Sequence, residues 1–253
     1  MDIKVLIASH REYKMPSDPM YVPVFVGAAL HDADIKGFER DDSGDNISLK
    51  NPYYCELTAL YWGWKNLDCD YMGLVHYRRH FMKEPCRFSW EKILDREDAE
   101  NIFRSGIDVI LPGKRHYIIE TLYSHYKHSH HPEDLQTAEY VISRDFPEYR
   151  EDFLNVMKSR SAHMFNMCIM KKEILDQYCR WLFEVLEKIE EQLDISSYSD
   201  FDKRVFGRIS ELLMDVWIRK NKIKYAELSV RNTEGEHLAS KAANVVKRKL
   251  LYR

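Results

Sequence analysis

Short, β-branched apolar runs alternate along the chain with segments whose apolar residues recur every three or four positions. The short runs predict buried strands and the periodic segments predict amphipathic helices. The predicted strands cover residues 3–9, 70–75, 108–112, 161–171 and 224–230. The predicted helices cover residues 53–67, 90–105, both sides of Pro132, 173–193 and 204–221. Strands that alternate with helices predict an α/β sheet flanked by helices, with the helices concentrated in the C-terminal half.

Polar residues follow the first two predicted strands. Ser9 and His10 come directly after the first apolar run, and HYRRHF follows the second. Ligands of open α/β sheets bind outside the carboxyl ends of the strands, so both segments are candidates for a binding site. Arginine offers a planar set of donors that suits phosphate, which makes Arg78 and Arg79 candidate anion ligands.

Adjacent residues of a strand point to opposite faces, so we expect only one of Arg78 and Arg79 to face a ligand if the strand continues that far. The alternative is that either arginine pairs with a carboxylate, such as Glu56 or Glu120, and so fastens the sheet. His76, at the start of the same segment, is a further candidate ligand.

The loop RDDSGDNIS, residues 40–48, combines oxygen ligands with glycine. It contains Asp41, Asp42, Asp45 and Asn46. These side chains are suited to sugar hydroxyls or to a divalent cation, although the loop lacks the glutamate of a twelve-residue calcium loop. A solvated turn has the same composition, and both interpretations remain open.

Four histidines lie in the segment YSHYKHSHHPEDL. They are His125, His128, His130 and His131. On a helix, His125 and His128 share one face and could hold zinc, but no third ligand is evident. The other interpretations are a wall of imidazoles facing a diphosphate and an exposed helical surface.

Two further pairs place polar groups among apolar ones. His163 and Asn166 lie in the run SAHMFNMCIM, where we expect them at the floor of a pocket or hydrogen-bonded inside the fold. Glu211 and Asp215 stand four apart on one predicted helix, and a carboxylate beside an apolar face can become a general base. An ordinary pair on the helix surface is the alternative.

Composition narrows the class of protein. The 253 residues are 45% hydrophobic, which suits a single domain, predicted here over residues 1–232. The net charge of -3 predicts no general attraction to nucleic acid. Five widely spaced cysteines and the absence of a signal peptide or a long apolar stretch predict a cytoplasmic protein, soluble or peripheral to a membrane.

Several motifs, in order, resemble a bacterial family of capsular polysaccharide and exopolysaccharide biosynthesis proteins known as DUF4422. They are DDSGDNISLKNPYYCELTALYWGWKN, DYMGLVHYRRHF, IETLYSHYKHSHHPEDL, SAHMFNMCIMKKE and FGRISELLMDVWI. The resemblance implies a GT-A-like fold and transfer of a sugar from a UDP-sugar donor, in some members galactofuranose. The implied acceptor is a growing, lipid-linked saccharide.

The same resemblance assigns roles to individual residues. It places Ser9 and His10 near the uridine and Asn166, by similarity to an FNxG strand, beneath the donor sugar. GT-A enzymes commonly hold Mn²⁺ or Mg²⁺ with an Asp-x-Asp motif at the position where this chain has HYRRH. We therefore expect a metal-independent enzyme in which Arg78 or Arg79 stabilises the departing UDP, with Asp41, Asp42 and Asp45 as the alternative metal ligands.

Glu211 is our first choice for the base that deprotonates the acceptor, ahead of Asp215 and Asp45. The tail, residues 233–253, carries basic residues among apolar ones and predicts a helix that contacts an anionic membrane weakly. Two other functions remain open: a sugar-nucleotide-binding or polysaccharide-binding partner without turnover, which needs no base, and a metal-dependent hydrolase built on the histidines.

Overall fold

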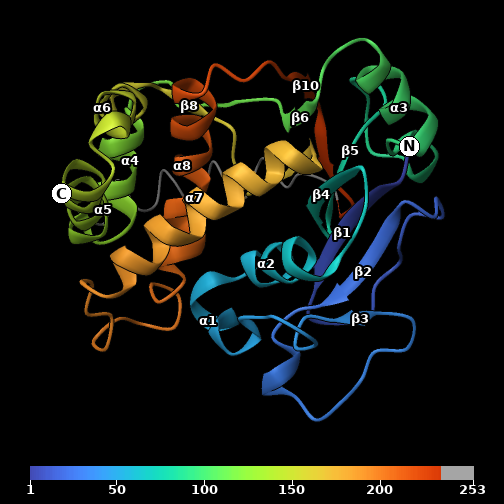
Figure 1. The fold of residues 1–253 in the computed structure, drawn as a ribbon, viewed down its shortest axis with the longest axis horizontal. Coiled ribbons are helices and arrows are strands. Elements are labelled where there is room, and N and C mark those ends of the chain that lie inside the picture. The colour runs from blue at the N-terminus through green and yellow to red at the C-terminus, as the bar shows by residue number, and fades with distance from the viewer. Residues whose placement is uncertain (235–253) are drawn as a thin grey trace.

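The first apolar run forms the central strand β1, Ile3–Ser9, because its side chains alternate between two buried layers. Leu6 and Ala8 contact one apolar core, and Val5 and Ile7 contact the other. The structure is a computed structural model that describes residues 1–234. Figure 1 shows β1 inside a twisted sheet with helices on both faces.

The main sheet has the order β10-β6-β9-β4-β1-β2-β3, and the short strand β5 joins β4 to β11 at its edge. Its strands are β2 Tyr21–Phe25, β3 Glu39–Arg40, β4 Tyr71–His76, β5 Arg79–Phe81, β6 Val109–Pro112, β9 Cys168–Lys171, β10 Ala226–Leu228 and β11 Val230–Asn232. The central pairs are parallel, whereas β9 runs antiparallel to both β4 and β6. A parallel sheet with one reversed inner strand agrees with the GT-A-like fold that the resemblance implies.

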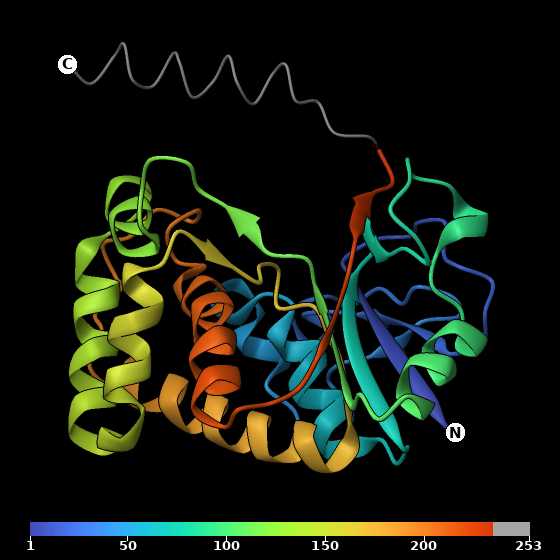
Figure 2. The same cartoon turned by 90° about the horizontal axis from the view of Figure 1, so that it is seen from above.

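The helices divide into those that cover the sheet and those that stand beside it. They are α1 Asn51–Tyr54, α2 Leu57–Asn66, α3 Arg96–Arg104, α4 Leu122–Ser129, α5 Pro132–Asp145, α6 Arg150–Lys158, α7 Lys172–Glu190 and α8 Val205–Lys220. α2 and α7 pack on one face of the sheet, and α3 packs on the other. Figure 2 shows α4, α5, α6 and α8 gathered beside the sheet as a helical half that packs against α7, which confirms the predicted concentration of helices.

The motif HYRRHF continues the second predicted strand and then reverses direction. β4 extends through His76, a two-residue turn contains Tyr77 and Arg78, and β5 pairs antiparallel with β4 through Arg79 and His76. The turn lies at the carboxyl end of β1, where Tyr77 donates a backbone hydrogen bond to the Ala8 carbonyl at 3.3 Å. The hairpin thus brings the cationic residues to the edge of the sheet where ligands bind.

The predicted strand over residues 161–171 is wrong as a single element. Ser161–Ala162 forms β8, which pairs with β7, Arg115–His116, whereas only Cys168–Lys171 joins the main sheet. Between them Phe165 and Asn166 take left-handed backbone angles, with φ of 78° and 53°. This turn redirects the chain because β9 must enter the sheet between β4 and β6, while β8 belongs to a ribbon outside it.

The helix predicted over residues 90–105 begins later, at Arg96. Asp95 caps it by accepting a hydrogen bond from the Asp98 N–H at 3.0 Å. Both helices around Pro132 are present, and Pro132 occupies the first position of α5. In residues 1–234, no helix combines the length and the hydrophobicity that a membrane span requires. The amphipathic helix predicted in the tail falls almost wholly outside this range.

Candidate active site

Two adjoining cavities open between the sheet and the helical half. The sheet-side cavity, about 550 Å³ in volume, lies at the carboxyl ends of β1 and β4. The helix-side cavity, about 350 Å³, lies between the Phe165 turn, α4 and α8. The residues that line both cavities are Cys55, Glu56, His76, Arg79 and Arg204. A ligand in one cavity can therefore meet a ligand in the other across this shared wall.

Cations dominate the wall of the sheet-side cavity. Arg78 and Arg79 line it from the sheet, and Lys203 and Arg204 line it from the segment before α8, against the two carboxylates of Glu56 and Asp200. His10 lines it as well. The pKa of His10 is lowered by burial and by the neighbouring positive charges of Arg11 and Arg78, so this imidazole is held in its neutral form at neutral pH. Such a surface suits a ligand with several negative charges.

The two adjacent arginines have different surroundings. Arg79 lies over the ring of Phe165 at 4.5 Å, and burial lowers the pKa of its guanidinium. Among residues 1–234, no carboxylate oxygen lies within 4.0 Å of Arg79. Arg78 lines only the sheet-side cavity, and its Nε lies 3.1 Å from Glu234 Oε1 without the alignment of a hydrogen bond. Neither arginine pairs with Glu56 or Glu120, but the alternative of a carboxylate partner holds for Arg78, which forms an ion pair with Glu234.

A hydrogen-bond network fixes the shared wall. Asn166 donates from Nδ2 to Glu56 Oε1 at 2.7 Å and to the Gly207 carbonyl at 3.0 Å, while its Oδ1 accepts from the Ser210 hydroxyl at 2.7 Å. His76 donates from Nε2 to the Phe165 carbonyl at 2.7 Å. Asn166 thus positions Glu56, and its left-handed backbone angle is one that asparagine tolerates better than most residues.

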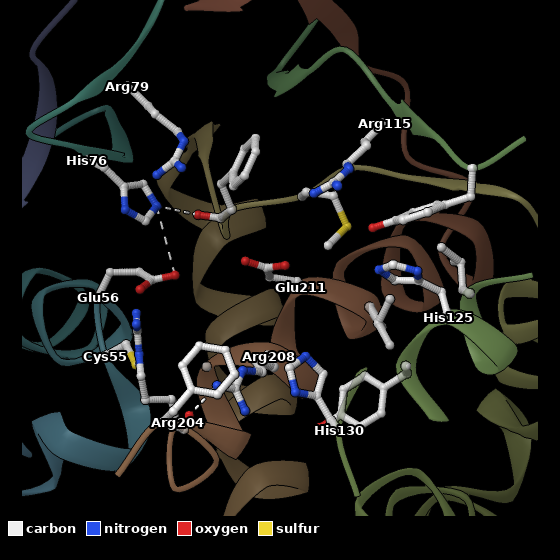
Figure 3. A pocket seen from close by; sticks show the side chains of 18 residues that line it. Cys55, Glu56, His76, Arg79, Arg115, His125, His130, Arg204, Arg208 and Glu211 are labelled. Atoms are coloured by element: carbon white, nitrogen blue, oxygen red, sulfur yellow. Dashed lines mark hydrogen bonds and ion pairs between the residues drawn. The ribbon is translucent and has the colours of Figure 1, made fainter. Parts of the chain in front are cut away.

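Glu211 projects from α8 into the helix-side cavity, where Figure 3 shows it facing Glu56 across the space. Burial, followed by the negative charge of Glu56, raises the pKa of Glu211 to about 8. A carboxyl group with a pKa near the working pH can take up and release a proton during a reaction. This geometry favours Glu211 among the three predicted bases.

Asp215, one turn further along α8, faces another part of the molecule. It accepts hydrogen bonds from the His163 backbone N–H at 2.8 Å and from His163 Nδ1 at 2.7 Å. His163 also contacts Glu227 at 3.1 Å through Nε2. The expected pocket floor is therefore wrong for His163 and Asn166, since both are buried and satisfied inside the fold, and their neighbours Met164 and Phe165 line the cavity instead.

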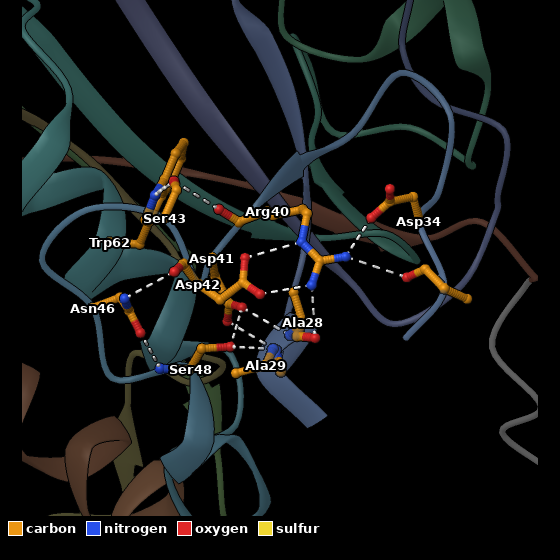
Figure 4. Close-up of polar contacts among 12 residues, drawn as sticks. Ala28, Ala29, Asp34, Arg40, Asp41, Asp42, Ser43, Asn46, Ser48 and Trp62 are labelled. Atoms are coloured by element: carbon orange, nitrogen blue, oxygen red, sulfur yellow. Dashed lines mark hydrogen bonds and ion pairs between the residues drawn. The ribbon is translucent and has the colours of Figure 1, made fainter. Parts of the chain in front are cut away.

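The acidic loop braces the fold outside both cavities (Figure 4). Asp41 is fully buried and accepts hydrogen bonds from the backbone N–H groups of Gly27 at 2.8 Å and Ala28 at 2.9 Å, and from the Ser48 hydroxyl. Asp42 pairs with Arg40, with oxygen-to-nitrogen distances of 3.0 and 2.6 Å, which lowers the pKa of its carboxyl group.

The remaining loop residues are also engaged locally. Asn46 donates to the carbonyls of Asp42 and Gly44, and Asp45 accepts from the Tyr61 hydroxyl at 3.2 Å. No group of three or more His, Cys, Asp or Glu residues within positions 1–234 converges as metal ligands do. The predicted roles of this loop as donor contact, metal ligand and base therefore find no support in the geometry, because its side chains hold its own backbone.

Replacing Asp41 with alanine is expected to lower the free energy of unfolding by about 3 kcal/mol, because it leaves buried N–H and O–H donors without an acceptor. Urea unfolding followed by circular dichroism measures the change. Asp32→Ala, at an exposed position nearby, is the matched control and should leave stability unchanged. A midpoint for Asp41→Ala equal to that of the control would contradict this structural role.

The predicted histidine cluster separates into two pairs. His125 and His128 each contact Glu120 at 2.9 Å. Of these two, His125 lines the helix-side cavity and His128 does not. His130 also lines that cavity, and burial followed by the Arg208 charge lowers its pKa to about 4. His131 stacks on Tyr198 away from it. The Glu120 carboxylate lies between the imidazoles of His125 and His128 and contacts both, in the space where a zinc ion would have to bind. The zinc interpretation is therefore not supported.

Of the two residues predicted to lie near the uridine, one is exposed to a cavity and the other is buried. His10 lines the sheet-side cavity, whereas Ser9 is buried and donates its hydroxyl hydrogen bond to the Arg11 carbonyl at 2.7 Å. The sequence interpretation missed several cavity residues: Cys55, Glu56, Arg115, Phe165, Arg204 and Arg208. The spacing of Arg204, Arg208 and Glu211, at i, i+4 and i+7, was the one available sign that they share a helical face.

The comparisons with known proteins agree with this architecture. The family model described as "Domain of unknown function (DUF4422)" matches residues 4–222. The chain belongs to the DUF4422 family. This DUF4422 chain is also similar to a solved apo structure of the bifunctional glycosyltransferase WbbM, with 32% sequence identity and a TM-score of 0.85. The match covers 92% of this chain and 45% of the WbbM chain. A search of curated proteins found no match.

Proposed function

We propose that this DUF4422 chain is a glycosyltransferase that binds a UDP-sugar in the sheet-side cavity and a saccharide acceptor in the helix-side cavity. The observation that carries the proposal is the shared wall, where Arg79, with no carboxylate partner among residues 1–234, and Glu56 lie between two cavities, while Glu211 faces Glu56 from the helix-side cavity. The similarity to WbbM, whose structure is named as a bifunctional glycosyltransferase, supports the same class of reaction.

In the proposed reaction the acceptor hydroxyl attacks the anomeric carbon of the donor. The bond from that carbon to the phosphate oxygen breaks, UDP leaves with the electron pair, and Glu211 takes the hydroxyl proton. The leaving diphosphate gains negative charge, which fixed cations next to it stabilise. We assign this role to Arg78 and Arg79, and the hydrogen bond of His76 to the Phe165 carbonyl supports it by fixing the wall between them and the proposed acceptor site.

The hairpin does not suit a divalent metal ion. His76 at the end of β4 and Tyr77 and Arg78 in the turn occupy the position where GT-A enzymes commonly carry an acidic pair, and a guanidinium repels a cation. The chain's own residues then supply the positive charge. We accordingly propose a reaction that does not require Mn²⁺ or Mg²⁺.

The finer parts of the proposal follow the family resemblance. The donor sugar is galactofuranose, and the acceptor is a lipid-linked saccharide of a growing capsular polysaccharide or exopolysaccharide. The reaction takes place in the cytoplasm, at the inner face of the membrane.

A screen of UDP-sugars by calorimetry, followed by a transfer assay, tests the proposal. UDP-galactofuranose and UDP-galactopyranose form a matched pair that differs only in ring size. Binding of UDP-galactofuranose together with release of UDP in the presence of acceptor would support the full proposal. Tight binding without turnover for every acceptor would favour the non-catalytic binding partner instead.

Glu234 lies beside the proposed diphosphate site, with its Oε1 at 3.1 Å from Arg78 Nε. Replacing it with glutamine is expected to tighten UDP binding by roughly 3- to 10-fold, because a negative charge next to the diphosphate is removed. Titration calorimetry at low and high salt measures the change, which should shrink as salt increases. Glu191→Gln, on an exposed surface at the end of α7, is the control, and equal affinities for the two variants would contradict the expectation.

A further inference from the structure

The helix-side cavity carries more positive charge than the proposed reaction uses. Its charged lining consists of four arginines, Arg79, Arg115, Arg204 and Arg208, against the two glutamates Glu56 and Glu211. Arg79 and Arg204 also line the sheet-side cavity, where they are available to the diphosphate. Arg115 and Arg208 line the helix-side cavity alone, so a UDP group in the other cavity leaves them without an anion.

Neighbouring carboxylates offset these two charges only in part, because Arg208 has one distant partner, Asp202, at 3.8 Å. Arg115 lies on β7 and contacts the ring of Tyr117 at 5.1 Å, and within residues 1–234 no carboxylate oxygen is within 4.0 Å of it. The facing acid, Glu211, has a pKa of about 8 and is mostly protonated at neutral pH. It therefore supplies little negative charge to this wall before the reaction starts.

Arg208 is held in place by contacts with the segment that precedes α8. Its guanidinium donates to the carbonyls of Phe201 and Asp202, the latter at 3.3 Å, and lies over the Phe201 ring at 4.3 Å. Asp202 Oδ1 is further away, at 3.8 Å, and burial lowers the pKa of Arg208. Partial burial of a guanidinium costs free energy, and an anionic group bound beside it offsets that cost.

The two arginines approach the cavity from different elements. Arg115 comes from the β7-β8 ribbon and Arg208 from α8, and Figure 3 shows Arg115 above Glu211 and Arg208 below it, beside His130. His125 and His130 line the same end. Since burial lowers the pKa of His130 to about 4, this imidazole is neutral and can bond to hydroxyl groups beside the anion.

We propose that the acceptor saccharide carries an acidic group, a carboxylate or a phosphate, that binds between Arg115 and Arg208. This inference rests on the proposed function, in which the helix-side cavity is the acceptor site. The acidic group sits beyond Glu211, away from the shared wall, so the hydroxyl that reacts belongs to the part of the acceptor nearer the donor. The arginine pair thereby selects the acceptor and sets its direction.

The test compares trigalacturonate with its neutral methyl ester, which has the same stereochemistry, and galactose 1-phosphate with galactose. Binding is followed by NMR, with and without saturating UDP. Trigalacturonate or galactose 1-phosphate should bind in the presence of UDP at least roughly 10-fold more tightly than its neutral counterpart. The two arms distinguish a carboxylate from a phosphate as the preferred group.

Variants separate the two cavities. Arg115→Gln should remove the preference for the acidic probe while UDP binding stays unchanged, and Arg78→Gln should weaken UDP while the preference remains. Arg180→Gln, at an exposed site on α7, is the control. Where Arg208→Gln fails to fold, Arg208→Lys keeps the charge and tests the same contact.

Equal binding of acidic and neutral probes in the presence of UDP would overturn the inference while leaving the proposed function intact. A preference for acidic over neutral UDP-sugars that depends on Arg115 would also overturn it, because the anion would then belong to the donor. Failure of the proposed function has a different result, namely no UDP binding in the wild type. Acidic probes that still bind through Arg115 in that case would support the anion site alone.

Discussion

Replacing Glu211 with glutamine is expected to lower kcat by roughly 10²- to 10⁴-fold, the usual effect of removing a general base. Glutamine keeps the shape of the side chain and cannot accept the proton. UDP binding, measured by calorimetry, should be unchanged, because Glu211 lines only the helix-side cavity. Glu184→Gln, on the exposed side of α7, is the control. Wild-type turnover by Glu211→Gln, with UDP bound normally, would exclude this residue as the base.

The pH dependence follows from the same residue. The base acts only when it is deprotonated, and the pKa of Glu211 is about 8, so kcat/KM should rise with pH and level off above about pH 8. Because Glu56 is the second cause of the raised pKa, Glu56→Gln should move this limb to lower pH.

The same pKa has a consequence for stability with the opposite sign. The folded-state pKa of Glu211 is raised, so its contribution to stability is present at low pH and is lost as pH rises through about 8. Glu211→Gln should therefore lose less stability than the wild type between pH 7 and 9 in thermal unfolding. Parallel melting curves for the two proteins over this range would contradict the raised pKa.

Replacing Arg79 with glutamine is expected to lower kcat by roughly 10²- to 10³-fold, comparable to removing one donor that stabilises transition-state charge. Arg78→Gln should instead weaken UDP binding more than turnover, because Arg78 lines the sheet-side cavity and not the shared wall. Arg104→Gln, an exposed residue of α3, is the control. Calorimetry with UDP and the transfer assay together separate the two effects.

Removing metal ions with a chelator tests the proposal that arginine side chains, and not a metal ion, stabilise the leaving UDP. Wild-type activity should persist in excess EDTA, since the proposed positive charge belongs to the protein. Complete loss of activity in EDTA, restored by Mn²⁺, would contradict it. The same result would require carboxylates other than those of the acidic loop, because Asp41 and Asp42 are engaged in hydrogen bonds within the fold.

The location of the cationic segment was predictable, whereas its shape was not. An apolar run followed by polar residues places HYRRH at the carboxyl edge of a sheet, and the structure confirms that place. The β5 strand of the hairpin also pairs with β11, which lies about 150 residues further along the chain. The secondary-structure propensities of residues 76–81 contain no information about pairing with β11.

For the buried polar residues His163 and Asn166, the sequence did not predict the surroundings of the side chains. His163 and Asn166 looked equally suited to a pocket and to internal hydrogen bonds, because a sequence states that a polar group is buried and not what satisfies it. Their partners Asp215 and Glu56 come from distant elements. Only the packing of α8 against the turn at Phe165 decided that these residues support the cavity wall and do not face the ligand.

By itself the sequence determined the alternation of strands and helices, the helix-rich second half and the family, because periodicity and ordered motifs are local properties of the chain. Only the tertiary structure decided which ionisable side chains lie next to one another. It turned Glu211 toward Glu56 and Asp215 toward His163, although the two acids are one helical turn apart. It also brought Arg115 and Arg208 to one cavity, where no carboxylate oxygen of residues 1–234 lies within 4.0 Å of Arg115 and Asp202 Oδ1 lies 3.8 Å from Arg208. Burial and charge proximity set these properties, and both depend on residues that the chain brings together only when it folds.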